Sequence, residues 1–460
     1  MKKDLPLKQG SAKKQVLVAY GQRFALLFVL PLIVPVVWML QTLSRYGVNV
    51  PYSDEWLIVP IFQRMEHGIT LATFHDLWHA QNFHRLFFTQ SIITIAANIT
   101  DWNIHAEMYI SFIFCLITAS IVYLFVRRTI KSNLFALLAM LLAGFWLFSP
   151  VQSENWLWGW DVAWFICTAA AVVSIYLITR ATGKYRYVFL TGAIAAGVVS
   201  IFSFGWGQAI WPVGLLLLLG QKQTKKPIII WSISALVAYA AYYFHYAHSG
   251  PPVPVLAFLH EPINAICYLF VMFGRPYTYD LYAAMTLGAV SLLLLLPVSL
   301  LLWQRRKQLT PYLPWLGLIF FALIGAVMIL LGRLVPDPHI NTPLTDALQP
   351  RYTAMPIIYI VGMSGLLLTM VDRLKLSKNL VMYLVLTILI VQVPLVWSSY
   401  YAGQVKSKER YELMVKLQRC SHLPAYAIEK DCLSSNNYLS TQDTAKQQIE
   451  YLRSKHWASY

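Results

Sequence analysis

Residues 24–56 read FALLFVLPLIVPVVWMLQTLSRYGVNVPYSDEW. The first part is an apolar run of about 20 residues, the length of helix that crosses roughly 30 Å of hydrocarbon. Two adjacent carboxylates, Asp54 and Glu55, follow a few residues later. Because charge is costly at membrane depth, ionisable groups placed there tend to mark function. This stretch therefore predicts a membrane protein with an acidic site just outside its first helix.

The composition agrees with an all-α polytopic membrane protein. Of 460 residues, 58% are hydrophobic and only 12% are charged, whereas soluble chains carry about 25% charged residues. No small-residue cleavage site follows the first apolar run, so we expect it to stay as a helix. Apolar runs predict about eleven membrane helices, near residues 24–44, 104–126, 133–148, 162–179, 187–203, 207–220, 227–247, 281–303, 312–332, 352–371 and 379–398.

The net charge of +16 is explained by topology. Most Lys and Arg outside the tail fall in the amino-terminal segment and in alternate turns, at 127–131, 180–186, 222–226, 305–307 and 373–378. Cytoplasmic loops carry such an excess. We therefore expect a cytoplasmic amino terminus and no nucleic-acid partner. The expected parts are a cytoplasmic segment 1–23, a membrane domain 24–398 whose first external loop is 46–103, and a small external tail 399–460.

The first external loop has predicted structure of its own. Residues 57–65 have helical periodicity and end at His67-Gly68. Residues 86–99 are apolar but too short to span, and a crossing there would reverse the sidedness of Arg127 and Arg128, so we predict an interfacial or re-entrant helix. Residues 409–417 and 441–451 of the tail are also predicted helices. Cys420 and Cys432 lie in the external tail, where we predict a disulfide.

Three motifs in this region carry a family resemblance: Ser53-Asp54-Glu55-Trp56, then His84-Arg85-Leu86-Phe87, then the polar break Asp101-Trp102-Asn103. Their order resembles the first external loop of the GT-C superfamily of glycosyltransferases, which includes protein O-mannosyltransferases and aminoarabinose transferases. The resemblance covers about 100 residues, and fold-level likeness alone does not fix activity. The chain lacks the large soluble carboxy-terminal domain of some members. Its size is similar to that of bacterial transferases that decorate surface polysaccharides such as O-antigen.

The resemblance implies a GT-C-like bundle and a specific activity. A sugar would pass from a polyprenyl-phosphate donor, with inversion, to a glycan or lipid-linked acceptor at the periplasmic face of the bacterial inner membrane. Such a transfer needs a carboxylate base for the acceptor hydroxyl and cations for the leaving phosphate. Asp54 is the first choice for the base and Glu55 the second. Neighbouring side chains point in different directions, so we expect one to face the acceptor and the other to orient it.

Arginines are the candidates for binding the donor phosphate. Every basic residue in the short external loops is Arg, which recognises phosphate with a forked pair of donors. The candidates are His84, Arg85, Arg275, Arg333 and Arg351. We expect Arg85 to stand at a helix amino terminus, which itself attracts anions, and two of the four arginines to touch phosphate. Headgroup snorkelling and loop salt bridges are the alternative roles.

Aromatic and acidic residues are the candidates for binding sugar or acceptor. Residues 154–161 contain Glu154, Trp158 and Asp161 among three tryptophans, and Trp206 lies in another tight turn. Trp56 would stack on a sugar or, more simply, anchor the loop at the membrane surface. Tryptophans also gather in the aromatic belts of membrane proteins without binding sugar.

A metal cofactor is not expected. His75 and His79 have the i, i+4 spacing of a zinc pair, and His84 follows. Structural roles are commoner for such residues, although some members of the superfamily use a divalent cation.

Three other classes stay open. A transporter or flippase for lipid-linked glycans would carry charges or broken helices at mid-membrane depth. An O-antigen polymerase or ligase would depend on external arginines but would not need the early carboxylate pair. A membrane acyltransferase would need a His base in an H-x(4)-D arrangement in a cytoplasmic or membrane position, and the sequence offers none there.

Overall fold

The structure is a computed structural model that describes residues 33–66, 68–81, 83–246, 257–333, 343–374, 378–421 and 442–458. A helix over residues 33–46 leads into the first loop. This loop contains η1 (Ser53–Ile58), α2 (Val59–Met65), α3 (Leu71–Trp78), the two-stranded antiparallel hairpin β1 (Ala80–Gln81) and β2 (His84–Arg85), and α4 (Phe87–Thr100). The predicted helices at 57–65 and 86–99 are confirmed. Helix α3 and the hairpin were not predicted.

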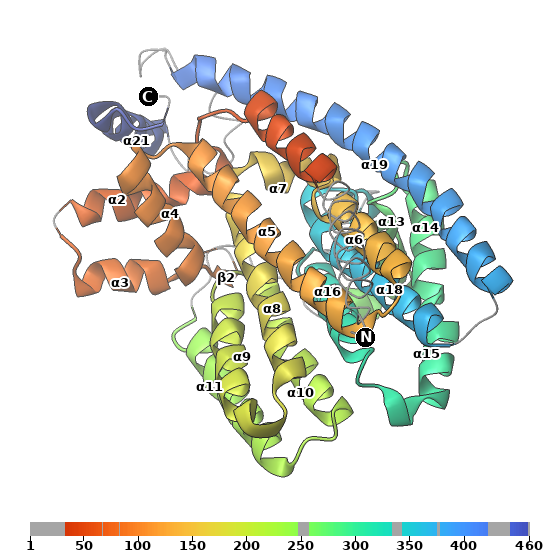
Figure 1. The fold of residues 1–460 in the computed structure, drawn as a ribbon. Helices are drawn as coiled ribbons and strands as arrows, with labels where there is room; N and C mark the ends of the chain where they lie inside the picture. Colours follow the sequence, from red (N-terminus) through yellow and green to blue (C-terminus); the bar gives the residue numbers. More distant parts are fainter. Residues whose placement is uncertain are drawn as a thin grey trace, which may run out of the picture.

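The bundle follows the loop (Figure 1). Its longer helices are α5 (Ile104–Thr129), α6 (Asn133–Leu147), α8 (Val162–Arg180), α9 (Arg186–Ile201), α10 (Ile210–Gly220), α11 (Lys225–Tyr243), α13 (Pro262–Gly274), α14 (Leu281–Leu293), α15 (Leu295–Gln304), α16 (Leu313–Arg333), α18 (Ala354–Arg373) and α19 (Lys378–Ser421). Short elements join them: η2 (Pro150–Gln152), α7 (Ser153–Leu157), η3 (Gly159–Asp161), η4 (Gly183–Tyr185), η5 (Gly205–Ala209), α12 (Ala257–His260), η6 (Arg306–Gln308), α17 (Pro343–Asp346) and η7 (Pro350–Thr353).

Within the described part of the chain, six helical stretches are long and apolar enough to cross a membrane: Ile104–Thr129, Asn133–Leu157, Gly159–Arg180, Leu281–Gln304, Leu313–Arg333 and Pro350–Arg373. The predicted count of about eleven is not confirmed by this measure. Helices α9 and α10 have only 16 and 11 residues. Helix α13 was not predicted at all.

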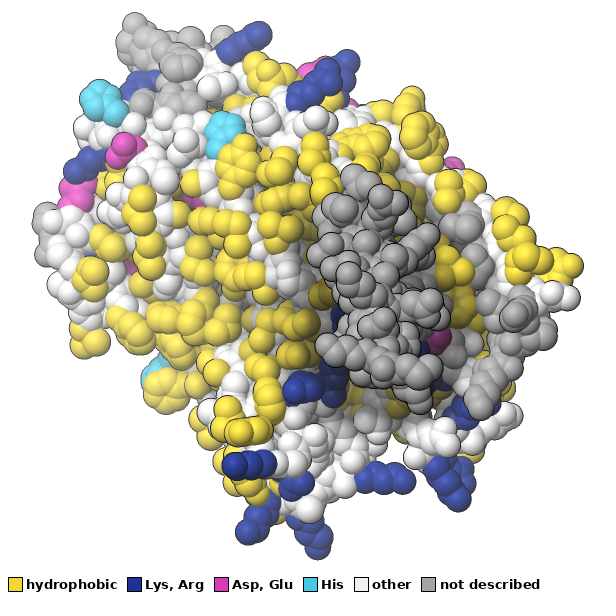
Figure 2. Space-filling model, in the orientation of Figure 1, with side chains coloured by type: hydrophobic (Ala, Val, Ile, Leu, Met, Phe, Trp, Pro, Cys, Tyr) yellow, Lys and Arg dark blue, Asp and Glu magenta, His cyan; other side chains and the backbone are white. Residues whose placement is uncertain are grey.

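A broad apolar surface covers the face of the bundle drawn in Figure 2. Figure 2 shows hydrophobic side chains across the middle of this face, with Lys and Arg at its lower end and others at its upper end. Large exposed apolar residues such as Ile113, Leu236 and Leu300 come from α5, α11 and α15. A contiguous apolar surface of this extent marks a membrane contact in a polytopic protein.

The basic turns lie together at one end, as the sidedness analysis predicts. The Asp372 carboxylate accepts the backbone N–H groups of Lys131 and Ser132 at 2.7 and 3.1 Å. The side chain of Gln223 donates to the Ala181 carbonyl at 2.8 Å. These bonds join turns that are distant in the sequence. The elements η1, α7, η3 and η7 also meet one another, and we call their meeting point the carboxylate end.

Two helices that were predicted separately are continuous at the start of the tail. Helix α19 runs without interruption for 44 residues, so the predicted membrane helix 379–398 and tail helix 409–417 are one helix. Figure 1 shows it lying along one side of the bundle. Helix α21 (Gln442–Lys455) docks on the first loop, where Lys455 pairs with Glu66 at 2.8 Å and Trp457 packs on Phe62.

Candidate functional site

The turn formed by residues 52–55, which we call the acidic turn, carries Asp54 and Glu55 and has an unusual backbone conformation. Ser53 has a φ of 51°, the left-handed region that non-glycine residues seldom occupy. This residue turns the chain immediately before Asp54 and Glu55. Asp54 is half-buried, whereas Glu55 is 1% exposed. The predicted division of the pair therefore holds: the two carboxylates face different surroundings.

Glu55 binds the backbone of two elements. Its Oε2 accepts the Tyr52 N–H at 2.6 Å, and its Oε1 accepts the Trp160 N–H at 2.9 Å. Burial raises the pKa of Glu55 from 4.5 to about 8, although both backbone bonds and the Arg410 charge oppose the rise. A carboxyl with this pKa is mostly protonated at neutral pH. Glu55 is therefore suited to holding η1 against η3, and Asp54 is the member of the pair left to act as a base.

A second buried carboxyl, that of Glu107 in α5, lies near Glu55 at Gly159. Its Oε1 accepts the Trp102 indole N–H at 2.9 Å. Gly159 separates the two acids, because a Cβ there would lie 2.8 Å from Glu55 Oε1 and closer still to Glu107 Oε2. Sequence analysis missed Glu107. The available signal was an acidic residue in the first turn of a long apolar helix.

The predicted acceptor loop meets the acidic turn. The Trp158 indole N–H donates to the Tyr52 carbonyl at 3.0 Å, and the two rings pack edge to face at 5.5 Å. Asp161 is 3% exposed and interacts electrostatically with Glu154, Asp54, Arg351 and Arg410. Asp161 is thus the point at which carboxylates and guanidinium groups from four elements meet.

Arg351 enters this cluster from η7. Its Nη1 donates to Glu154 Oε1 at 2.8 Å, and its backbone carbonyl accepts from the Asn155 side chain at 3.0 Å. Its Nε is buried and has no hydrogen-bond partner among the described residues. Arg333, at the end of α16, lies 5.8 Å from the centroid of the Tyr352 ring, and Arg351 lies 5.2 Å from it. The structure therefore brings two of the predicted arginines to the same tyrosine.

Arg275 is buried at the start of the turn that follows α13. Its Nε donates to the Leu348 carbonyl at 2.5 Å, and its guanidinium lies 3.4 Å from the centroid of the Tyr279 ring. Its two terminal amino groups are buried with no acceptor in the described part of the chain. Burial lowers the pKa of Arg275, while its interaction with Tyr279 and the Glu154 charge oppose the fall. A guanidinium with two unsatisfied buried donors is poised for an anion.

Arg85 differs from its predicted role. It lies in β2, before α4 begins, and its guanidinium donates to the backbone carbonyls of Trp78, Tyr242 and Phe244. These bonds occupy Nε and both terminal nitrogens. Arg85 directly precedes the N-cap of α4, as expected, but its guanidinium ties the first loop to the end of α11. It has little capacity left for a phosphate.

His84 is buried against the aromatic rings of η5. Its ring lies 4.2 Å from that of Phe204, and a Cβ on Gly205 would clash with it. Burial first, and then the charge of Arg333, lower the pKa of His84 to about 3. A neutral imidazole offers a phosphate one N–H and no positive charge.

The candidate tryptophans all lie inside the protein. Trp56 is 2% exposed, which corrects the prediction of an anchor at the membrane surface. Trp206 is 4% exposed and packs against Trp164 and Phe204, with ring centroids 3.5 and 4.0 Å apart. Trp158 is 6% exposed and contacts the acidic turn directly. Trp158 is the one of the three that joins the acidic turn from another loop.

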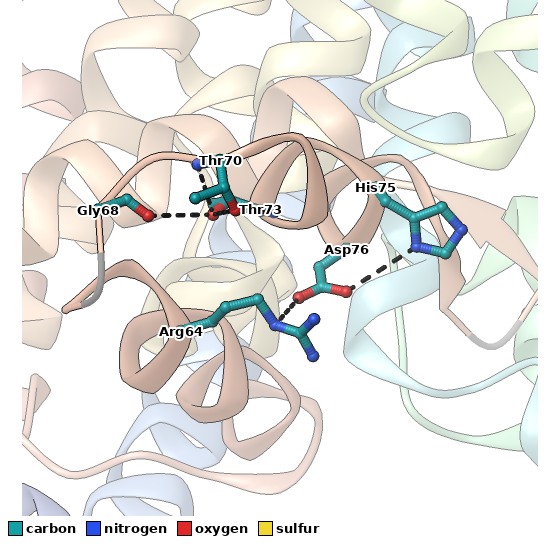
Figure 3. A network of polar contacts seen from close by, with 6 residues as sticks. All are labelled: Arg64, Gly68, Thr70, Thr73, His75 and Asp76. Atoms are coloured by element: carbon teal, nitrogen blue, oxygen red, sulfur yellow. Dashed lines mark hydrogen bonds and ion pairs between the residues drawn. The ribbon is translucent and has the colours of Figure 1, made fainter.

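The histidine pair lies on the outer side of the loop. Figure 3 shows Asp76 between Arg64 and His75, with distances of 2.6 and 4.0 Å to their nitrogens. The His75 side chain is 75% exposed. Among the described residues, no group of three or more His, Cys, Asp or Glu could hold a metal ion. The predicted disulfide is not tested, because Cys432 and the side chain of Cys420 lie outside the described residues.

Arg410 is a second residue of the site that sequence analysis missed. It projects from α19, with its guanidinium 4.1 Å from the centroid of the Tyr52 ring and 5.8 Å from that of Trp158. Its Nε and Nη2 are buried without a partner among the described residues. The sequence placed it in the tail, more than 350 positions from Asp54, and gave no sign that α19 returns to the first loop.

Comparison with solved structures finds a similar protein. The crystal structure of ArnT from Cupriavidus metallidurans bound to undecaprenyl phosphate matches with a TM-score of 0.41 and 13% sequence identity, over 93% of this chain and 77% of that chain. Neither family models nor curated proteins match the chain. At this TM-score and identity no activity or residue role is transferred from ArnT.

Proposed function

We propose that the chain is an inverting glycosyltransferase that moves a sugar from a polyprenyl phosphate to a glycan or lipid-linked acceptor. The observation that supports this most is the convergence of η1, α7, η7 and α19 around Asp161 in η3. There a half-buried carboxylate, Asp54, lies among guanidinium groups that keep unsatisfied donors. The reaction would occur at the periplasmic face of the bacterial inner membrane, with the amino terminus in the cytoplasm.

Asp54 is the proposed base. Its carboxylate takes the proton of an acceptor hydroxyl as that oxygen attacks the anomeric carbon of the donor sugar. The new glycosidic bond forms while the bond between the anomeric carbon and the phosphate oxygen breaks. One displacement inverts the anomeric centre. Glu55, bound to two backbone N–H groups, fixes the turn that carries Asp54.

Arg351, Arg333 and Arg275 are the proposed ligands of the departing phosphate. The lipid phosphate leaves with its negative charge, and preorganised cations stabilise that charge as it develops. Arg351 and Arg333 both lie near the Tyr352 ring. The two terminal amino groups of Arg275 are buried and have no hydrogen-bond acceptor among the described residues. Glu154 sets the direction of Arg351 through their ion pair. Arg85, whose donors are occupied, is left out of this set.

The proposal is tested by separating donor binding from transfer. Undecaprenyl phosphate is titrated into the purified full chain in detergent, and binding is read from the rise in melting temperature. Transfer is read from the masses of surface glycans in cells that produce each variant. Transfer that is lost in Asp54→Asn while binding survives, together with binding that weakens in Arg351→Ala, supports the assignment. A lipid-linked glycan transporter would tolerate Asp54→Asn in both measurements, as would a polymerase or ligase.

A further inference from the structure

Lys406 and Arg410 form a row of two basic residues on α19 that reaches the acidic turn, and the Lys406 ammonium pairs with Glu409 at 2.6 Å. The two residues are four apart, so they lie one above the other on the same face of the helix. The Lys406 ammonium lies 5.5 Å from the centroid of the Tyr279 ring, and Arg410 lies over the Tyr52 ring at 4.1 Å. The row therefore runs from the Arg275–Tyr279 pair to the residues beside Asp54.

Arg410 is held by aromatic rings, but two of its hydrogen-bond donors are unsatisfied. It lies against two aromatic rings, Tyr52 and Trp158, which pack on each other. Its Nε and Nη2 are buried and unpartnered among the described residues. Buried donors without acceptors are rare in folded proteins and call for an explanation. Two adjacent free donors of one guanidinium match the two oxygens of a phosphate or carboxylate.

The surrounding chain keeps this part of α19 in place. Gly403 lies so close to Pro150 that a Cβ would clash with its backbone, and Ser399 hydrogen-bonds to Ser149 at 2.9 Å. Met414 packs on Val48 and Val50, just before the acidic turn. The helix is thus held against η2 before Arg410 and against the first loop after it. This packing fixes Arg410 relative to Asp54.

We propose that Arg410, flanked by Lys406, binds an anionic group on the acceptor, a phosphate or a carboxylate. The inference rests on the proposed function. Arg333 and Arg351 face Tyr352, whereas Arg410 faces Tyr52 in the turn that holds Asp54. An anion held by Arg410 therefore lies beside the turn that carries Asp54. When Arg410 binds the anionic group of the acceptor, the acceptor's reacting hydroxyl is brought near Asp54.

The test titrates inorganic phosphate, and separately glucuronate, into the full chain already saturated with undecaprenyl phosphate. Chloride at matched ionic strength is the reference. The wild type is expected to gain further thermal stability with one of the two anions, which identifies the acid group. Arg410→Gln is expected to weaken that anion about tenfold or more, the loss of a charge-assisted hydrogen bond. Undecaprenyl phosphate binding should be unchanged.

Lys408→Ala is the matched control, because Lys408 is 70% exposed on the same helix. It should bind both anions as the wild type does. Arg410→Lys keeps a charge but loses the forked donors, so it should also weaken the anion if Arg410→Gln does not fold. Unchanged anion binding in a folded Arg410 variant overturns the proposal, as does a loss of undecaprenyl phosphate binding instead. If undecaprenyl phosphate does not bind the wild type, the proposed function fails, and the anion titrations alone still test Arg410.

Discussion

Glu55 accepts the backbone N–H of Trp160 at 2.9 Å, and this bond joins the acidic turn to η3. The bond connects residues 105 positions apart. It sets where Asp54 lies relative to Asp161, and so determines whether the proposed base and the arginine cluster share one site. The predictions below follow from this arrangement.

Glu55 should make stability depend on pH. Its folded pKa of about 8 exceeds the ordinary value of 4.5, so the folded protein holds its proton more tightly. The stabilisation is fully present below about 4.5 and is lost as pH rises towards about 8. The melting temperature of the wild type should fall across this window, and Glu55→Gln should flatten the fall. Equal pH slopes in both proteins would show that Glu55 does not carry the buried proton.

Gly159 should resist substitution. A Cβ at this position would overlap Glu107 Oε2 and crowd Glu55 Oε1, so Gly159→Ala must displace a buried carboxyl. We expect a cost of about 1–3 kcal/mol, typical of overpacking, measured as a lower melting temperature. Gly332→Ala is the control, since nothing lies within 4 Å of its Cβ. Comparable melting temperatures for the two variants would contradict the close approach.

Arg351→Ala should weaken undecaprenyl phosphate binding about tenfold or more, because a charge-assisted hydrogen bond contributes about 1.5–3 kcal/mol. Binding is measured by titration of the purified protein. Arg64→Ala removes an Arg of the first loop that pairs with Asp76, and it should bind normally. Equal losses in both variants would indicate a general charge effect and not a site at Arg351.

Arg85→Ala should damage folding and leave donor affinity unchanged. Three backbone carbonyls lose their donor, and each unsatisfied buried group costs about 1–3 kcal/mol. Arg85→Lys should not restore stability, because one ammonium cannot copy the fork. The readouts are melting temperature and undecaprenyl phosphate affinity of the folded fraction. A stable Arg85→Ala protein that binds undecaprenyl phosphate weakly would show that Arg85 is a phosphate ligand.

Local patterns predicted the elements, and long-range contacts decided the roles. The helices at 57–65 and 86–99 follow from periodicity and turn residues, which act over a few positions. The loop with Glu154 and Asp161 was found because acids and tryptophans are concentrated there. Arg85 was misread because its acceptors Tyr242 and Phe244 lie about 160 positions away. Arg410 was missed for the same reason, because the Tyr52 and Trp158 rings that it contacts lie more than 250 positions away.

The most direct test of the central claim is transfer by Asp54→Asn. Surface glycans are analysed by mass in bacterial cells that lack the endogenous protein and produce either the wild type or the variant at equal membrane levels. The base assignment predicts that the added sugar mass falls at least about 100-fold in the variant, within the usual contribution of a general base, while undecaprenyl phosphate still binds. Sugar addition at the wild-type level by the Asp54→Asn protein would contradict it.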